Sequence, residues 1–404
     1  MTSSRHGQIL ISGAGVAGLS AALELSARGW KVLIVEKAAK LTEVGAGLQL
    51  APNAMRHLQR LGVANHLAPN AVTPDTLYLV DGRSARPLLA MELGQKAEQR
   101  WQNPYWVCHR ADLQAALLET CREHANITIA LNATVSTRSV NGATIHCVIE
   151  RDGKLQSLDV DYHLACDGVW SQARAEARLD GAEFSGHIAW RTTLATDSLP
   201  DSFASALAQK TAVSAWLGPN SHFIAYPVKA GKSFNFVAIT KGENPGKLWS
   251  RSGDSTRLRK HFAQWSQPVR DILAATENWT YWPLFQMPKA QFVGADRTIF
   301  LGDASHAVTP FAAQGAAMAI EDAAALAAAL DMPDRSAGLR KFDTVRKARL
   351  ATVAKRGQMN RFAYHATGIF ALGRNLLFAA RSADAFLADL DWLYEYDAAG
   401  AIAA

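Results

Sequence analysis

The sequence predicts an α/β fold whose parallel sheet is assembled from three separate stretches of the chain. Three short patterns support this prediction, and each stands at the end of an apolar run: residues 13–18 (GAGVAG), 166–168 (CDG) and 301–306 (LGDASH). Short apolar runs bounded by such turn residues are typical of buried parallel strands. The three stretches are therefore expected to form one domain, with other sequence inserted between them.

The first stretch has the pattern of a dinucleotide-binding unit. An apolar strand at 8–12 precedes the glycine loop, a helix is expected over 16–28, and a second strand at 31–35 is followed by Glu36, 23 positions after Gly13. In such units the first glycine permits a tight turn, the second lets the backbone approach a pyrophosphate, and the third lets the helix pack closely on the strand. The helix N-terminus offers free N–H groups to the phosphates.

We assign these three roles to Gly13, Gly15 and Gly18, and we assign Glu36 to the ribose hydroxyls. A carboxylate at that position disfavours a 2′-phosphate by charge repulsion. A plain strand–helix turn would need neither all three glycines nor the acid. This stretch alone leaves both NAD and FAD open.

Two further features point toward a bound ring. Gly45 and Gly47 precede a helix expected to open at Pro52 and to stop at Gly62. A loop with two glycines would let backbone press against a flat ring, and a plain turn is the alternative. Arg110 stands near the start of another expected helix, where the dipole disfavours a cation, so it has either a specific partner or a surface position.

The middle and late strands end in aspartate. Asp167 follows the strand at 162–166, with Ser171 expected to cap a short helical turn that contains Arg174, and Asp303 follows the strand at 298–301. Aspartate beside glycine is also common in ordinary turns. A long alanine-rich helix opens at residues 315–317, where small residues permit close approach of a ligand and the dipole would stabilise negative charge on it.

Composition narrows the class of protein. The 404 residues are 49% hydrophobic and 19% charged, which is typical of an ordered globular chain of two or three domains. Much of the net charge of +6 lies at 335–361, in basic residues at helical spacing that include Arg346 and Arg349. A solvated helix face is the favoured interpretation, with attraction of an anionic ligand as the alternative. No nucleic-acid partner is expected, because no aromatic residues are interleaved.

The composition also indicates the cellular compartment of the protein. The four cysteines fit no zinc pattern and are expected to be ordinary buried thiols, so no metal is predicted. No secretory signal and no uncharged apolar run of spanning length is visible. We therefore expect a cytoplasmic protein without a membrane span.

With these patterns in this order, the chain resembles the single-component FAD-dependent aromatic hydroxylases over nearly its full length. The most similar branch includes salicylate hydroxylase, 3-hydroxybenzoate 6-hydroxylase and 6-hydroxynicotinate 3-monooxygenase. The resemblance implies a Rossmann-like FAD-binding domain, an interleaved antiparallel-sheet substrate domain and C-terminal helices. It assigns to FAD the residues Gly13, Gly15, Val16, Ala17, Gly18, Glu36, Lys37, Gly47, Leu48, Arg110, Val135, Asp167, Asp303, Gly315, Ala316 and Ala317.

The implied activity is hydroxylation of a small aromatic compound, such as a hydroxybenzoate or a hydroxypyridine carboxylate. NADH or NADPH would dock transiently and reduce FAD, and the reduced flavin would trap O2 as a C4a-hydroperoxide that transfers one oxygen atom. The residues that we assign to the substrate are Gln49, His222, Tyr226 and Pro310. Gln49 stands where some relatives place a histidine, so the substrate, the ring position and any decarboxylation are left open, as is the choice between monomer and homodimer.

His222 and Tyr226 are the candidate catalytic residues. They lie four positions apart on an expected strand, and this even spacing places both side chains on one face. A base near a phenol helps to form the more reactive phenolate, so we assign His222 as the base and Tyr226 as a hydrogen bonder that orients the substrate. The alternative is a histidine satisfied within the sheet. His306 lies in the flavin motif, where a structural role is expected.

We expect the FAD domain to comprise residues 1–72, 101–180 and 286–340, and the substrate domain 73–100 and 181–285. The helical tail, 341–404, has an apolar face that would pack on the body or on a second subunit. Aromatic residues of the middle region line the pocket or form ordinary core. They are Trp190, Trp216, Phe223 and Phe236.

Two rival functions remain at this point. A flavin halogenase or reductase on the same scaffold is one, although residues 279–283 (WTYWP) do not match the spacing of the halogenase tryptophan motif. A non-catalytic flavin-binding module is the other.

Overall fold

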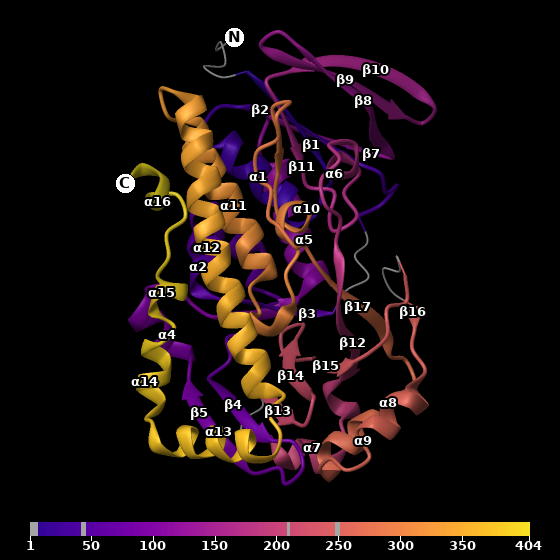
Figure 1. Ribbon diagram of the computed structural model, residues 1–404, viewed down its shortest axis with the longest axis vertical. Helices are drawn as coiled ribbons and strands as arrows, with labels where there is room; N and C mark the ends of the chain where they lie inside the picture. Colours follow the sequence, from indigo (N-terminus) through magenta and orange to yellow (C-terminus); the bar gives the residue numbers. More distant parts are fainter. Residues whose placement is uncertain (1–6, 42–45, 208–210, 247–250) are drawn as a thin grey trace.

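The computed structural model describes residues 7–41, 46–207, 211–246 and 251–404. Its upper half in Figure 1 contains a five-stranded parallel sheet in the order β18-β11-β1-β2-β7. The strands are β1 (Gln8–Ser12), β2 (Lys31–Glu36), β7 (Ile127–Leu131), β11 (Tyr162–Ala165) and β18 (Thr298–Phe300). Because β1 pairs with both β2 and β11, and β11 pairs with β18, all three predicted stretches meet in one sheet. The predicted fold class is confirmed.

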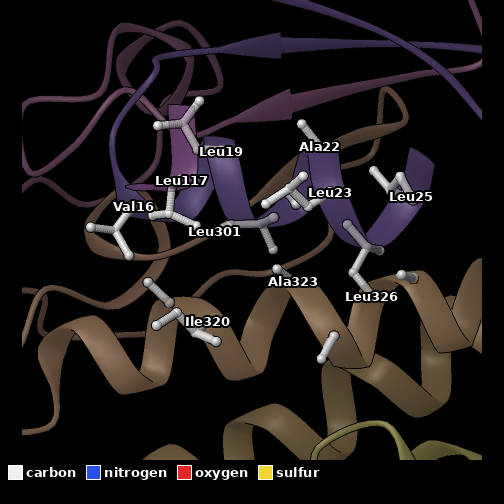
Figure 2. Packing of buried hydrophobic residues seen from close by; sticks show 14 of the residues in the cluster. Val16, Leu19, Ala22, Leu23, Leu25, Leu117, Leu301, Ile320, Ala323 and Leu326 are labelled. Carbon is white, nitrogen blue, oxygen red and sulfur yellow. The ribbon is translucent and has the colours of Figure 1, made fainter. Parts of the chain in front are cut away.

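Helices lie on one side of this sheet. They are α1 (Val16–Ser26), α2 (Pro52–Arg60), α3 (Val63–Leu67), α5 (Arg110–Arg122) and α11 (Gly315–Leu330). Helix α1 packs directly on the sheet, α5 and α11 pack on α1, and α2 and α3 pack on α11 and α5. Figure 2 shows α1 and α11 side by side, with Ile320, Ala323 and Leu326 of α11 on the side of that helix that faces α1. The alanines of α11 allow the two helix backbones to approach closely, and this packing fixes both helix N-termini at the same edge of the sheet.

The opposite face carries a three-stranded antiparallel sheet. It consists of β8 (Ala133–Asn141), β9 (Thr144–Arg151) and β10 (Lys154–Val160). Its inner residues Ile145 and Cys147 pack on Leu10 and Val35 of the parallel sheet. The parallel strands are therefore buried on both sides, which explains their continuous apolar runs.

The lower half is an eight-stranded sheet in the order β16-β17-β12-β15-β14-β13-β4-β5. Its members are β4 (Thr76–Asp81), β5 (Pro87–Glu92), β12 (Glu183–Ala195), β13 (Val213–Gly218), β14 (Ser221–Val228), β15 (Ser233–Lys241), β16 (Arg251–Ser252) and β17 (Thr280–Gln286). Neighbours run antiparallel except β13 and β4. A two-stranded sheet of β3 (Gly47–Leu50) and β6 (Trp106–His109) lies between the halves, and η1 (Thr196–Ser198) and α4 (Gly94–Trp101) complete the region.

Alternation along these strands separates core from cavity. Trp190, Trp216, Phe223 and Phe236 belong to one buried cluster, together with residues of α7 (Asp201–Ala206), α8 (Ser255–His261) and α9 (Gln267–Ala275). These four aromatic residues are therefore core, which is one of the two alternatives that the sequence left open, and they do not line the main cavity. Their neighbours in sequence project from the other face of the sheet.

The C-terminal part is helical, as expected. It comprises α12 (Arg335–Tyr364), α13 (Gly368–Ala380), α14 (Ala383–Ala388), α15 (Asp391–Tyr394) and α16 (Gly400–Ala403). Phe378 of α13 is buried, whereas Phe370, Leu372, Leu376 and Leu377 are at least half exposed. The apolar face of the tail therefore does not pack on the body, and its packing on a second subunit stays a prediction, as do the domain boundaries.

The basic helix differs from the favoured interpretation at two positions. Arg346 and Arg349 of α12 are buried, and both bind Glu321 of α11. Lys347 between them is exposed and pairs with Asp343, one turn earlier. The helix has a solvated face, but its inner face carries cations because α11 presents two buried carboxylates to it. Among the described residues, no helix has the length and apolar character required to cross a membrane.

Candidate active site

One cavity of about 880 Å³ extends from the parallel sheet to the eight-stranded sheet. Most of the predicted site residues line it: Gly13, Gly15, Val16, Ala17, Glu36, Lys37, Gly47, Leu48, Gln49, Arg110, Val135, Asp167, His222, Tyr226, Asp303, Pro310, Gly315 and Ala316. Gly18 and Ala317 do not line it, and Gly45 lies outside the described residues. The three stretches of the nucleotide pattern and the proposed base therefore share one space.

The three glycines of the loop are required for different reasons. A Cβ on Gly13, which has φ +102°, would clash with the carbonyl of Cys166, and a Cβ on Gly18 would clash with the carbonyl of Gly13. Gly15 is different, because a Cβ there would meet no protein atom within 4 Å and would enter the cavity. The first and third glycines serve backbone packing, whereas the second keeps space free for a ligand.

Two of the helices that begin at the cavity, α1 and α11, leave their first N–H groups available. Neither α1 nor α11 has a side-chain cap or an acidic residue in its first turn. At Gly315 a Cβ would again meet nothing within 4 Å. Two uncapped helix N-termini at one cavity favour an anionic ligand.

Glu36 lies at the end of β2, beside the glycine loop. Its two carboxylate oxygens accept hydrogen bonds from the backbone N–H of Ala14 (2.8 Å) and of Ala38 (2.9 Å). Each oxygen keeps a second lone pair, so the carboxylate is oriented by the protein and can still accept from a ribose hydroxyl.

Asp167 stands at the opposite side of the loop. Its Oδ2 accepts from the N–H of Gln172 (2.8 Å) at the start of α6 (Gln172–Glu176), while its Oδ1 is buried and has no partner among the described residues. Ser171 caps α6, as expected. Arg174 binds the carbonyls of Asp180 (2.5 Å) and Lys289 (3.0 Å), so it joins α6 to the chain ahead of β18. One carboxylate oxygen of Asp167 is therefore available to a ligand, whereas Arg174 has a structural role.

The third motif, residues 301–306, lines the cavity with Leu301, Gly302 and Asp303. Gly302, at φ +57°, precedes α10 (Asp303–His306), and a Cβ on it would press on Ala17 of α1. Asp303 is exposed toward the cavity, whereas His306 is buried with its Nε2 2.5 Å from Asp322 Oδ2. His306 therefore has the structural place that was expected. Pro310 opens the 3-10 turn η2 (Pro310–Ala312), which leads into α11.

The loop around Gly47 joins the two halves of the site. The backbone N–H of Gly47 donates to Oδ1 of Asn235 on β15 (2.7 Å), and a Cβ on Gly47 would clash with the ring of Tyr226. Gln49 Oε1 accepts from the Tyr105 hydroxyl (2.5 Å). The glycine at 47 is therefore needed for contact with the substrate-side sheet, and Gln49 is held in place at the cavity wall.

His222 and Tyr226 project from β14 into the cavity, on the same face, as their spacing predicted. His222 is buried, and its Nδ1 lies 2.8 Å from Nε2 of His365 at the end of α12. Burial, together with His365 and His187, lowers the pKa of His222 well below its ordinary value. Burial likewise raises the pKa of the Tyr226 hydroxyl. At neutral pH the site therefore holds an uncharged imidazole and an uncharged phenol.

Two residues were not foreseen from the sequence, one that contacts His222 without lining the cavity and one that lines the cavity. His365 is one, because nothing in the chain connects residue 365 with a strand near residue 222. Arg191 of β12 is the other, and it lines the cavity beside Trp282. A signal for Arg191 existed, since it alternates along the strand with Ile188 and Trp190, which are core residues on the other face.

Similarity to known proteins identifies the scaffold. A family profile described as FAD binding domain matches residues 6–359. The chain belongs to the FAD-dependent aromatic hydroxylases. It is 33% identical over 396 residues to 3-hydroxybenzoate 6-hydroxylase 1 of Aquipseudomonas alcaligenes, covering 96% of this chain and 98% of the relative. It is 31% identical to 3-amino-4-hydroxybenzoate 2-monooxygenase PtnB3 of Streptomyces platensis, with 98% of each chain covered. Klebsiella pneumoniae HpxO, solved with FAD and uric acid, has the same fold (TM-score 0.81, 20% identity, 99% and 98% covered).

FAD is the cofactor of this hydroxylase, and the cavity fits it. The open positions at Gly15 and Gly315, the two uncapped helix N-termini and the unused oxygen of Asp167 are suited to a long ligand with phosphates and hydroxyls. The volume also lies within the range of about 300–1,000 Å³ that is usual for ligand pockets.

Proposed function

We propose that this enzyme uses NADH or NADPH and O2 to hydroxylate a small hydroxylated aromatic acid. The observation that carries the proposal is that His222 and Tyr226 face the same cavity as the flavin-site glycines. The named activities of the relatives, which act on hydroxybenzoates, support this substrate class. Four buried free thiols support a reducing compartment, and we place the enzyme in the cytoplasm.

The bound FAD supplies electron transfer and the activation of O2, and the chain supplies position, proton transfer and exclusion of water. Gly15 and the start of α1 would hold the pyrophosphate, Glu36 would bind the ribose, and Asp167 and Asp303 would bind other polar groups of the cofactor. Gly315 and Ala316, at the start of α11, would hold the ring. Lys37, Leu48, Arg110 and Val135 complete the walls.

His222 acts as the base on the ring hydroxyl. With its Nδ1–H donating to His365 Nε2, the lone pair of His222 Nε2 is left for the proton of the substrate. Its lowered pKa keeps the imidazole unprotonated throughout the neutral range, and it also lowers the basicity of the ring, so the assignment rests on the position of His222 in the cavity. Tyr226 and Gln49 orient the ring by hydrogen bonds, and Pro310 limits its position.

The cavity wall beside His222 is apolar. Ile224, Val237 and Ile239 line it from β14 and β15. A dry wall disfavours water at the place of oxygen transfer, where water would promote loss of hydrogen peroxide.

Purified protein tests this proposal directly. Its visible spectrum should show bound flavin, and a panel of hydroxyaromatic acids should stimulate both oxygen uptake and oxidation of NADH or NADPH. Mass spectrometry should find a product heavier than the substrate by one oxygen atom. If hydroxylation is decarboxylative, the product should instead have gained one oxygen atom and lost one CO2, and it should be lighter than the substrate. Oxidation of NAD(P)H that yields only hydrogen peroxide with every acid in the panel would contradict the proposal.

A further inference from the structure

Arg191 lines the cavity, and the described residues provide no hydrogen-bond partner for its guanidinium. It lines the cavity from β12, and its Nε is buried without a partner. Its guanidinium carbon lies 5.1 Å from the centre of the Trp282 ring, which contacts one face of the group. The planar guanidinium of Arg191 thus presents N–H donors to the cavity, and no described residue accepts a hydrogen bond from them.

Four other arginines, which are buried in the protein, have a different environment. Arg346 and Arg349 bind the carboxylate of Glu321, while Arg174 and Arg374 bind backbone carbonyls. This contrast matters because burial of a cation without a partner is costly. A group outside the protein chain is therefore expected to complete the hydrogen bonding of Arg191.

The charges around Arg191 favour an anion. Burial lowers the pKa of Arg191 to about 10, and Arg110 acts in the same direction while Tyr226 opposes it. The guanidinium therefore stays charged at neutral pH. Since Arg110 is also a cation, the electrostatic environment of Arg191 is positive and a negatively charged group would relieve it.

The position of Arg191 distinguishes this anion from the pyrophosphate of FAD. The phosphate-binding features, Gly15 and the start of α1, belong to the parallel sheet, whereas Arg191 belongs to the eight-stranded sheet that carries His222. In register, Arg191 pairs with Val237, and Val237 pairs with Ile224, so Arg191 lies two strands from β14 and one alternate position along from His222. Strand spacing puts the two Cα atoms about 12 Å apart, and both side chains lie on one face. That separation leaves room for one aromatic ring between the two side-chain tips.

We propose that Arg191 is the receptor for the carboxylate of the substrate, so that the enzyme takes aromatic acids whose ring hydroxyl faces His222. A carboxylate matches the guanidinium fork with two parallel hydrogen bonds. This inference rests on the proposed function for the identity of the ring, but its test is a binding measurement and needs no turnover.

Paired ligands test the inference on the FAD-loaded enzyme. The 2-, 3- and 4-hydroxybenzoates and their carboxamides have the same ring and differ in the charge of one substituent. Each is titrated into wild type, Arg191→Gln and Arg191→Lys while the flavin absorbance is followed. Hydrogen bonds to a charged partner predict that the best acid binds wild type about 10- to 100-fold more tightly than its amide. In Arg191→Gln this preference should fall to about threefold or less, with the amide affinity unchanged, and Arg191→Lys should keep part of it.

Several results would overturn the inference. They are an acid preference that survives Arg191→Gln, an equal loss of acid and amide binding, and a wild type that binds no acid of the panel. Loss of FAD from both variants would instead assign Arg191 to the flavin. Failure of the proposed function is a separate outcome: Arg191-dependent binding of an acid without any hydroxylated product would refute hydroxylation and leave this inference standing.

Discussion

His222 and His365 lie within hydrogen-bond distance, with Nδ1 of the first 2.8 Å from Nε2 of the second, although 143 residues separate them in the chain. His365 is less buried than His222, and its ring lies 5.6 Å from that of His187. Burial, with contributions from His187, Arg361, Lys241 and His261, lowers the pKa of His365 to about 3. The pair is therefore neutral, and it fixes which nitrogen of His222 faces the cavity.

Substitution of either histidine should affect catalysis more than cofactor binding. A general base contributes about 100-fold or more to rate, so His222→Ala should slow product formation by about that factor while the dissociation constant for FAD changes little. His365→Phe should lower the rate less, because it removes the partner of the base and leaves the base, and His365→Gln should restore part of the loss through its amide. Rapid-reaction kinetics and flavin titration measure the two quantities. An unchanged rate of product formation in His222→Ala would remove its assignment as the base.

The first two glycines of the loop should separate cofactor binding from folding. Gly15→Val places its side chain in open cavity, so the free energy of unfolding of the apoprotein should change little while FAD affinity falls at least tenfold. Gly13→Ala should instead destabilise the protein, because its Cβ would clash with Cys166 and its φ is +102°. Urea unfolding of the apoproteins and FAD titration provide both readouts. Equal destabilisation by the two substitutions would show that the space at Gly15 is not reserved for a ligand.

The buried ion cluster on α12 should be a main source of stability. Arg346 binds Asp322 (2.8 Å) and Glu321 (2.7 Å), and all three side chains are fully buried. Arg346→Met leaves two buried carboxylates short of a cation, which typically costs about 3–5 kcal/mol. Lys347→Met on the same helix removes an exposed pair and should cost about 0.5 kcal/mol or less. Similar unfolding free energies for the two variants would contradict the importance of the cluster.

Acid should destabilise the fold through histidines that are buried without charge. His163 accepts a hydrogen bond at Nδ1 from Arg138 (2.8 Å), and burial, followed by Arg138, lowers its pKa from 6.5 to about 3. The unfolded chain therefore binds a proton below pH 6.5 that the folded chain does not, so stability is fully present above pH 6.5 and falls as pH drops toward 3. In His163→Asn the loss between pH 6 and 5 should be shallower by about 1.4 kcal/mol per pH unit, as expected for one proton. Parallel pH dependences would show that His163 can be protonated in the folded state.

The flavin half was predictable because its signals are local. A strand, a glycine loop, a helix and an acid lie within about thirty residues, and the geometry of that unit fixes where Gly13, Gly15 and Glu36 must lie. His222 and Tyr226 were placed together for a similar reason, since alternation along one strand decides which side chains share a face.

The remaining features depend on contacts between distant segments. Helical spacing gives a charged helix two sides, but it does not say which side meets Glu321, so Arg346 could not be distinguished from Lys347. The role of Arg191 depends on which face of β12 meets the cavity, and that is set by pairing with β15 and β17. His365 depends on where a thirty-residue helix ends.

The length of α12 has a consequence for how the enzyme can be altered. The helix is anchored to α11 through Arg346, and His365 follows nineteen residues later, about 28 Å along the axis, at the far sheet (Figure 1). Insertion of a single alanine between these points would turn the far end by about 100° and advance it by about 1.5 Å. The imidazole at position 365 would then swing away from its partner although no residue of the cavity had been touched. Natural or engineered insertions in α12 would thus alter the position of the partner of His222 without changing any residue that lines the cavity.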